Sequence, residues 1–194
     1  MKGKKRAVFD VDDILWGLNE KVAEILGYDG NLITNFSIRK CTKIDADTQE
    51  KIIALYGNIN TFKEMKFYEG VEDLLRLEEA GVEVSICSNS MTKDIAISKT
   101  EQLLRKIKGL REEQLQMNII SEKTHHQKDI KSGIWVLVDD SPYNIAASEA
   151  EIDIMRPHPW NQSPEGKEIY KAKHPIFIPT LIETVDYIYQ KAVA

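Results

Sequence analysis

The sequence has few cysteines and no long apolar run. Its 194 residues include only two cysteines, Cys41 and Cys87, which do not form a CxxC pair. Two cysteines cannot build a disulfide framework, so we expect reduced thiols and a cytoplasmic protein. No apolar stretch approaches the roughly 18 residues that a membrane-spanning helix needs. The basic residues 2–6 are followed by only three apolar residues before Asp10, which is too short for a secretion signal.

The sequence also lacks an excess of positive charge. Lysine and arginine number 26 against 31 aspartates and glutamates, for a net charge of −5. Proteins that bind long nucleic acids through their phosphates usually carry a basic face, so we expect no such partner. Neither GxGxxG nor GxxxxGK[ST] occurs, and the four histidines show no HxxH or HExxH spacing. A dinucleotide-dependent dehydrogenase, a P-loop NTPase and a zinc enzyme are therefore not supported.

Short apolar runs alternate with helical patterns along most of the chain. The runs predict strands at 6–10, 82–88, 118–121, 134–138, 152–155 and 176–178. The helical patterns predict helices at 71–80, 92–108, 142–149 and 180–191, with Ser141 and Thr180 as N-caps. Near-continuous apolar strands that alternate with helices form parallel sheets covered on both faces. We therefore predict an α/β fold with a Rossmann-like parallel sheet and helices on both faces.

One stretch interrupts this alternation. Residues 16–66 contain helical patterns, such as 49–56, but no convincing strand. A segment of about 50 residues is too long for a loop inside a compact domain. We therefore predict an α/β core of residues 1–15 and 67–194, with residues 16–66 inserted as a small helical cap over the carboxyl ends of the strands.

Acidic residues follow directly on two of the apolar runs. Asp10 and Asp12 come after the first run, and Asp139 and Asp140 after the run at 134–138. Ligands of open α/β sheets bind beyond the carboxyl ends of the strands, where crowded carboxylates are costly without a cation. A donor set made only of oxygen suits Mg²⁺. The alternative, for either pair taken alone, is a solvated acidic turn.

Two weaker signals accompany the acidic pairs. Ser88 and Asn89 end the second run, where small polar groups can donate hydrogen bonds to phosphate oxygens. Lys128 precedes Asp139 and could neutralise a phosphoryl group. Taken alone, Ser-Asn-Ser is an ordinary loop sequence and most lysines are surface charges. These residues gain meaning only from their order relative to the acidic pairs.

Taken in order, the motifs resemble those of the haloacid dehalogenase superfamily of phosphatases. The resemblance covers residues 6–16, 70–90 and 117–161, and insertions after the first motif are frequent in that superfamily. It implies that Asp10 is the nucleophile that forms an aspartyl-phosphate. It also implies that Asp12 first protonates the leaving group and then activates water. Ile14 departs from the pattern, since many members carry a threonine hydroxyl there.

The same resemblance implies a ligand set. Mg²⁺ would bind the Asp10 carboxylate, the backbone carbonyl of Asp12 and the Asp140 carboxylate, with Asp139 acting through a water or in the outer shell. The phosphoryl oxygens would be held by Ser88, Asn89 and a lysine. Lys128 matches that lysine best, and Lys123 is the second candidate.

A narrower resemblance concerns the substrate. The acidic pair followed by Pro159-Trp160-Asn161 resembles the 5′(3′)-deoxyribonucleotidase branch, which often has Pro-Tyr-Asn there. It implies a nucleoside monophosphate substrate whose base stacks on aromatic residues of the cap. The available aromatics, each of which could instead be core packing, are Phe36, Tyr56, Phe62, Phe67 and Tyr68. The alternatives are a phosphatase for sugar phosphates or nucleic-acid 3′-phosphates, and a catalytically silent binding module on the same scaffold.

Overall fold

A six-stranded sheet forms the centre of the molecule. The structure is a computed structural model that describes residues 5–120 and 133–194. Its strands, all parallel, lie in the order β3-β2-β1-β4-β5-β6. They span Lys5–Phe9 (β1), Val82–Ser90 (β2), Leu115–Ile119 (β3), Val136–Asp139 (β4), Ile152–Met155 (β5) and Ile176–Phe177 (β6). The predicted Rossmann-like parallel sheet is confirmed.

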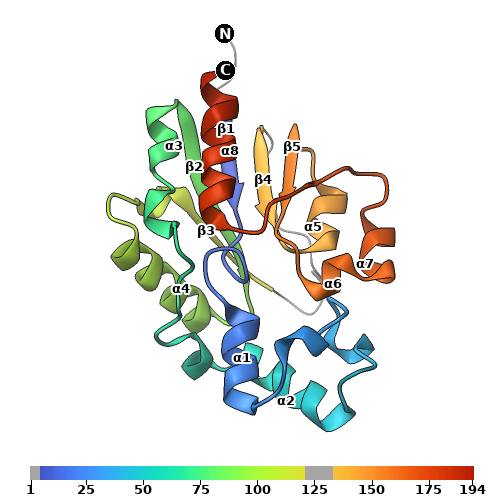
Figure 1. Cartoon of the computed structure of the whole chain (residues 1–194). Coiled ribbons are helices and arrows are strands. Elements are labelled where there is room, and N and C mark those ends of the chain that lie inside the picture. Colours follow the sequence, from blue (N-terminus) through green and yellow to red (C-terminus); the bar gives the residue numbers. More distant parts are fainter. Residues whose placement is uncertain (1–4, 121–132) are drawn as a thin grey trace.

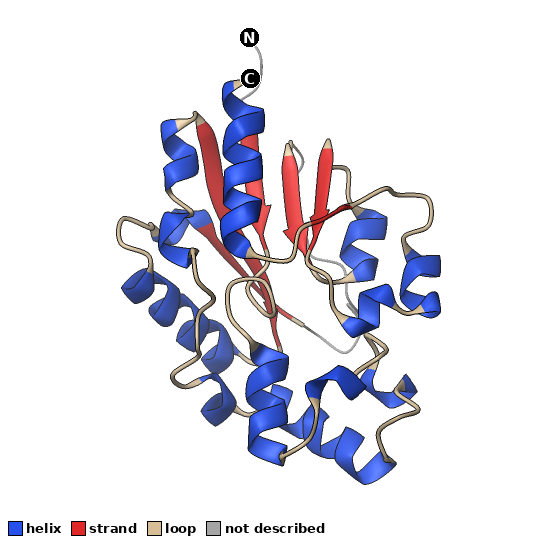
Figure 2. Ribbon diagram, in the orientation of Figure 1, coloured by secondary structure: helices blue, strands red, loops and turns tan. Residues whose placement is uncertain are grey.

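Helices flank this sheet (Figure 2). They span Leu18–Leu26 (α1), Ala46–Tyr56 (α2), Arg76–Glu79 (α3), Lys93–Lys106 (α4), Pro142–Ala147 (α5), Pro159–Gln162 (α6), Pro164–Ile169 (α7) and Leu181–Val193 (α8). Short 3-10 turns lie at Gly30–Leu32, Ile38–Lys40, Ile59–Phe62, Val71–Asp73 and Glu112–Gln114. The predicted caps are present, since the hydroxyls of Ser141 and Thr180 accept backbone N–H groups of the first turns of α5 and α8.

The pleat of the strands divides the core into two layers. Phe9 and Val138 point to one face, where they pack with residues of α3, α4 and α8. Val8 and Leu137 point to the other face, where they pack with Ile145 of α5 and with Tyr170, which follows α7. Successive side chains of a strand point to opposite faces, so the continuous apolar runs of the central strands supply both layers.

Residues 16–66 lie beyond the carboxyl ends of the strands, where α1 and α2 are seen in Figure 1. The segment contains α1, α2 and three of the 3-10 turns, and no strand of the sheet occurs within it. Its buried residues Ile33, Ile52 and Phe62 belong to the same apolar cluster as Phe9 and Val11 of the sheet and its following loop. The inserted segment therefore shares one continuous core with the sheet.

Two predicted elements differ in the structure. The single helix predicted at 71–80 is a 3-10 turn followed by the one-turn helix α3. Its fully buried residues Val71, Leu74 and Leu77 are three apart, which matches the three-residue repeat of a 3-10 helix. The strand predicted at 118–121 lies earlier in the structure, at Leu115–Ile119 (β3), on the edge of the sheet. Apolar residues alternate with polar ones in β3, so a continuous apolar run marks only the end of this strand.

Two short helices, α6 and α7, were not predicted. Each starts at a proline in its first turn and is too short to show an apolar repeat. In the described ranges, no helix combines the length and the apolar character that crossing a membrane would require.

Candidate active site

Three buried carboxylates meet at the carboxyl ends of β1 and β4. Phe9 pairs with Val138 across the two strands, and the backbone N–H of Asp10 donates to the Val138 carbonyl at 2.9 Å. This register places Asp10 beside Asp139 and Asp140. One carboxylate oxygen from each of the three lies within 4.8 Å of the other two, and all three side chains are buried. The structure thus brings together residues that are about 130 positions apart in the sequence.

This arrangement fits a hard divalent cation. The donor set consists only of carboxylate oxygens, as Mg²⁺ prefers. Both oxygens of Asp139 accept hydrogen bonds from the Asn144 side-chain amide, at 3.1 and 3.2 Å, and one also accepts the Ser141 N–H at 2.9 Å. Such contacts suit a carboxylate that orients the site from outside the first coordination shell. Asp10 and Asp140 would then supply the direct carboxylate ligands.

Asp12 lies beside a buried lysine that the sequence analysis did not identify. The Nζ of Lys99, on α4, lies 2.5 Å from Asp12 Oδ2, 3.0 Å from Ser88 Oγ and 2.9 Å from the carbonyl oxygen of Asn89. The Lys99 side chain is 1% exposed, whereas that of Asp12 is 23% exposed. The other Asp12 oxygen accepts the indole N–H of Trp16 at 2.8 Å. Lys99 therefore joins the first and second motifs through their side chains.

A sequence signal for Lys99 does exist. Lys99 falls four residues after Ile95 and four before Leu103, so it occupies the apolar face of α4. A lysine on the buried face of a helix is unusual, because burying its ammonium group requires a partner. The periodicity of α4 could therefore have singled it out.

The three residues predicted to bind phosphate, Ser88, Asn89 and Lys128, differ from one another in their surroundings. Ser88 is fully buried next to Lys99. The side-chain oxygen of Asn89 accepts a hydrogen bond from the Asn118 amide on β3 at 3.3 Å. Asn89 also lines the cavity between the strand ends and the inserted segment, which is described below. Lys128, and the second candidate Lys123, lie outside the described residues.

Asp13, in the segment that follows β1, connects this segment to the first helix of the insertion, α1. It is buried, and its backbone has a φ of 59°, in the left-handed region. Its carboxylate accepts hydrogen bonds from the backbone N–H (3.0 Å) and the side-chain amide (2.6 Å) of Asn19. The Asn19 side chain in turn accepts the Tyr56 hydroxyl of α2. Burial, opposed by the Asn19 hydrogen bonds and assisted by the charge of Asp12, raises the pKa of Asp13 to about 7.

A cavity of about 480 Å³ separates the strand ends from the inserted segment. Asp10, Asp12 and Asp140 contribute to one wall. Three of the five aromatics that were candidates for stacking on a base contribute to the other, namely Phe36, Tyr56 and Phe62. The remaining two do not line it: Phe67 packs edge-on against Trp16, and Tyr68 lies under the Arg156 guanidinium. The volume is within the usual range for a small-molecule site.

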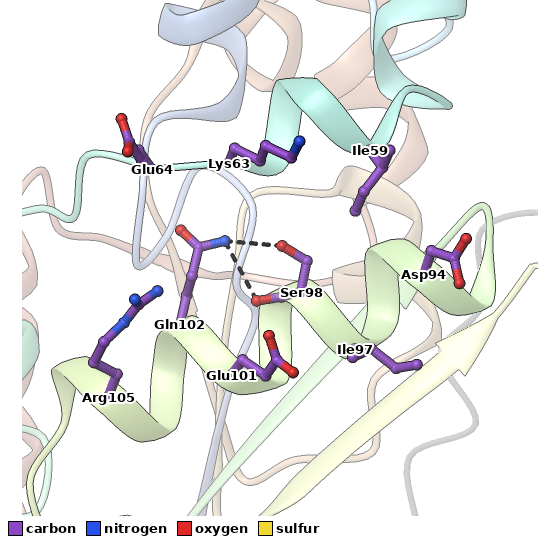
Figure 3. Close-up of a pocket in the computed structure, with 9 residues that line it drawn as sticks. All are labelled: Ile59, Lys63, Glu64, Asp94, Ile97, Ser98, Glu101, Gln102 and Arg105. Carbon is purple, nitrogen blue, oxygen red and sulfur yellow. Dashed lines mark hydrogen bonds between the residues drawn. The ribbon is translucent and has the colours of Figure 1, made fainter.

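A second pocket lies between α4 and residues 59–64 of the inserted segment (Figure 3). Lys63, Glu64, Glu101 and Arg105 are among its charged lining residues. Gln102 at its base donates to both the carbonyl and the hydroxyl of Ser98 and to the carbonyl of Phe62, so it ties α4 to the inserted segment. Among the residues that the structure describes, no predicted site residue lines this pocket.

The fold is that of the haloacid dehalogenase-like hydrolases. A protein described as a haloacid dehalogenase-like hydrolase, from Burkholderia xenovorans, superposes with a TM-score of 0.55 at 15% identity, over 98% of this chain and 99% of that one. β-Phosphoglucomutase from Clostridium difficile matches with a TM-score of 0.49 at 11% identity, over 97% of this chain and 98% of that one. The first likeness establishes the fold, and the second adds nothing to it. No family model matches the sequence, and no curated protein matches it significantly.

Proposed function

We propose that this protein is a Mg²⁺-dependent phosphatase that acts through an aspartyl-phosphate on Asp10, and that its substrates are nucleoside monophosphates. The observation that supports this most is the meeting of Asp10, Asp139 and Asp140 beside the Asp12–Lys99 pair. This set contains a nucleophile, an acid, a cation and a metal-ligand group at one end of one sheet. When bound, Mg²⁺ would supply positive charge to the phosphoryl group and to Asp10.

In the first step, an Asp10 carboxylate oxygen attacks phosphorus and the bond to the leaving oxygen breaks. Asp12 donates a proton to that oxygen, and the product alcohol departs. Before substrate binds, Asp12 is paired with the Lys99 ammonium group. An incoming phosphate offers Lys99 a second anion, so Lys99 can turn towards the phosphoryl oxygens while Asp12, which is partly exposed to the cavity, takes up a proton from solvent water. Ser88, whose hydroxyl contacts Lys99, would bind the same oxygens.

In the second step, Asp12 accepts a proton from a water molecule that attacks the phosphorus of the aspartyl-phosphate. The bond between phosphorus and the Asp10 oxygen breaks, inorganic phosphate leaves, and the Asp10 carboxylate is restored. The Trp16 indole N–H holds Asp12 in place through both steps, because it binds the oxygen that Lys99 does not contact.

The cavity wall opposite the carboxylates supports a nucleotide as the substrate. That wall is mostly apolar and aromatic, with Ile33, Phe36 and Ile53 among its members, and its polar residues are Asn19, Ser37 and Arg39. A nucleobase presents a flat face that can stack on an aromatic ring, whereas a sugar needs many hydrogen-bonding partners. Phe36, Tyr56 and Phe62 are the aromatic residues of this wall, and Phe36, whose ring also packs against Tyr143 with centroids 5.7 Å apart, is the one we test as the platform for the base.

The chemical proposal is tested with Asp10→Asn. This variant keeps the shape of the side chain but removes the nucleophile, so hydrolysis of p-nitrophenyl phosphate should fall on the order of 10⁴-fold or more. Chelation with EDTA should abolish the activity of the unaltered protein, and added Mg²⁺ should restore it. Asp153→Asn, a carboxylate on β5, serves as the matched control and should retain activity. Activity that persists in pure Asp10→Asn would refute the mechanism.

The substrate proposal is tested with one panel of compounds. Nucleoside 5′- and 3′-monophosphates, sugar phosphates and an oligonucleotide 3′-phosphate are compared by kcat/KM under identical Mg²⁺ concentrations. We expect the mononucleotides to be the best substrates. A clear preference for sugar phosphates would overturn the nucleotide assignment and leave the phosphatase mechanism intact.

A further inference from the structure

The turn that begins α6 holds both the side chain and the main chain of Asp140. The indole N–H of Trp160 donates to Asp140 Oδ2 at 3.0 Å, and the Trp160 side chain is buried. The next residue, Asn161, donates from its side-chain amide to the Asp140 carbonyl at 3.0 Å. The same amide donates to the carbonyl of Arg156 at 2.8 Å. One short turn therefore sets where the Asp140 carboxylate lies and how it is rotated.

This turn is itself rigidly supported. The imidazole of His158 stacks on the indole of Trp160, with ring centroids 4.3 Å apart and planes 5° apart. The backbone N–H of His158 donates to the Asn161 side chain at 2.9 Å, and the Tyr170 hydroxyl donates to the Asn161 carbonyl at 2.9 Å. Gly166 of α7 packs so closely that a Cβ there would collide with the Trp160 carbonyl oxygen. The indole therefore cannot shift freely if Asp140 is pulled away.

We propose that Trp160 is a positioning residue that sets the cation preference of the site, favouring Mg²⁺ over Ca²⁺ by engaging one oxygen of Asp140. The inference rests on the proposed metal site. Ca²⁺ takes six to eight oxygen ligands and readily accepts both oxygens of one carboxylate. Mg²⁺ demands six ligands in a tighter shell and keeps several waters. Binding of one cation through both oxygens of Asp140 would compete with the Trp160 hydrogen bond for Oδ2, and the packed turn resists the rotation of the carboxylate that this binding needs.

The chain offers a matched control for removing an indole. Trp135 is also buried and lies immediately before β4, whereas Asp140 follows the other end of that strand. The Trp135 ring contacts Lys5, with the ammonium nitrogen 4.4 Å from the ring centroid, and is not among the residues that line the cavity. Trp160→Phe and Trp135→Phe therefore delete the same group from buried positions at opposite ends of one strand.

The experiment measures equilibrium binding of Mg²⁺ and of Ca²⁺ by calorimetry, without substrate, for the unaltered protein and both variants. Outer-shell partners typically contribute 10- to 100-fold to metal affinity. We expect Trp160→Phe to weaken Mg²⁺ binding about 10-fold and to weaken Ca²⁺ binding less, so that the Mg²⁺/Ca²⁺ affinity ratio falls. Trp135→Phe should leave the ratio unchanged. If Trp160→Phe folds and its Mg²⁺/Ca²⁺ affinity ratio equals that of the unaltered protein, the inference about Trp160 is overturned but the proposed metal site is not. If the unaltered protein binds neither cation, the proposed metal site is overturned as well.

A second measurement needs no variant at position 160. The indole ¹⁵N–¹H resonances of the three tryptophans are assigned by elimination, using Trp16→Phe and Trp135→Phe. In the unaltered protein, Mg²⁺ should leave the Trp160 indole proton protected from solvent exchange, and Ca²⁺ should increase its exchange. Equal protection with the two bound cations would contradict the inference even if Trp160→Phe does not fold.

Discussion

The two walls of the cavity are built in different ways. On the sheet side, Asp10 and Asp140 follow directly on the paired strands β1 and β4, and their positions are set by the backbone register of the two strands. On the other side, Phe36 and Arg39 come from turns of residues 16–66 and are placed by side-chain contacts, Phe36 with Tyr143 and Arg39 with Glu50. The first wall can be held to the accuracy that bond-making needs. We therefore expect substitutions on the sheet side to lower the activity towards every substrate. Substitutions on the opposite wall should lower the activity by an amount that depends on the leaving group.

The largest effect should come from Lys99→Met, which tests the sheet side. Removing one group that stabilises developing negative charge typically lowers kcat by 10²- to 10³-fold. We expect that loss for p-nitrophenyl phosphate and for nucleotides alike, as measured by steady-state kinetics. Lys63→Met, in the pocket between α4 and residues 59–64, is the control and should keep normal kcat. An unchanged kcat in Lys99→Met would mean that another positively charged group stabilises the negative charge of the phosphoryl group.

An intermediate and selective effect should come from Phe36→Leu, on the opposite side. Stacking on one base contributes about 1–3 kcal/mol, so kcat/KM for nucleoside monophosphates should fall about 5- to 100-fold. The value for glycerol phosphate should change little, because that substrate has no ring to stack. Phe67→Leu serves as the control, because Phe67 is a half-buried aromatic that does not line the cavity. If kcat/KM falls equally for both substrates in Phe36→Leu, Phe36 supports the fold rather than recognising the base.

The smallest effect should come from Arg39→Ala. The Arg39 guanidinium lines the cavity and pairs with Glu50 at 3.0 Å, but both side chains are more than half exposed. Solvent screens such a pair, so the KM for nucleotides should rise only roughly two- to fivefold. The difference from the unaltered enzyme should shrink in about 0.5 M salt. A larger change that persists in salt would mean that Arg39 binds substrate directly.

Much of the fold could be predicted because buried parallel strands leave contiguous apolar runs. β1 and β5 were found within one residue of their bounds by this signal. The acidic pairs were also informative, since parallel strands end at the same edge of a sheet. The edge strand β3 and the short helices α6 and α7 were misplaced or missed, because half-exposed or very short elements carry little periodicity.

The site was harder to predict wherever a residue acts through a contact distant in sequence. The periodicity of α4 marks Lys99 as a buried lysine, but its partner is found only when that face of α4 is set against Asp12. Trp160 was noticed for its place in a Pro-Trp-Asn turn, which suggested a substrate class. In the structure its indole instead holds Asp140. Neither contact can be derived from spacing along the chain, because each depends on how two separate elements meet.

The core shared by the sheet and residues 16–66 bears on how a protein with this fold could acquire a new ligand specificity. Ile33, Ile52 and Phe62 pack in one cluster with Phe9, so the inserted segment does not fold around an interior of its own. A chimera that receives this segment from another protein would also need matching residues beneath it, or it would leave cavities costing about 2–5 kcal/mol for each large side chain lost. New specificity should therefore arise more readily by single replacements along the cavity lining than by exchange of the whole insertion.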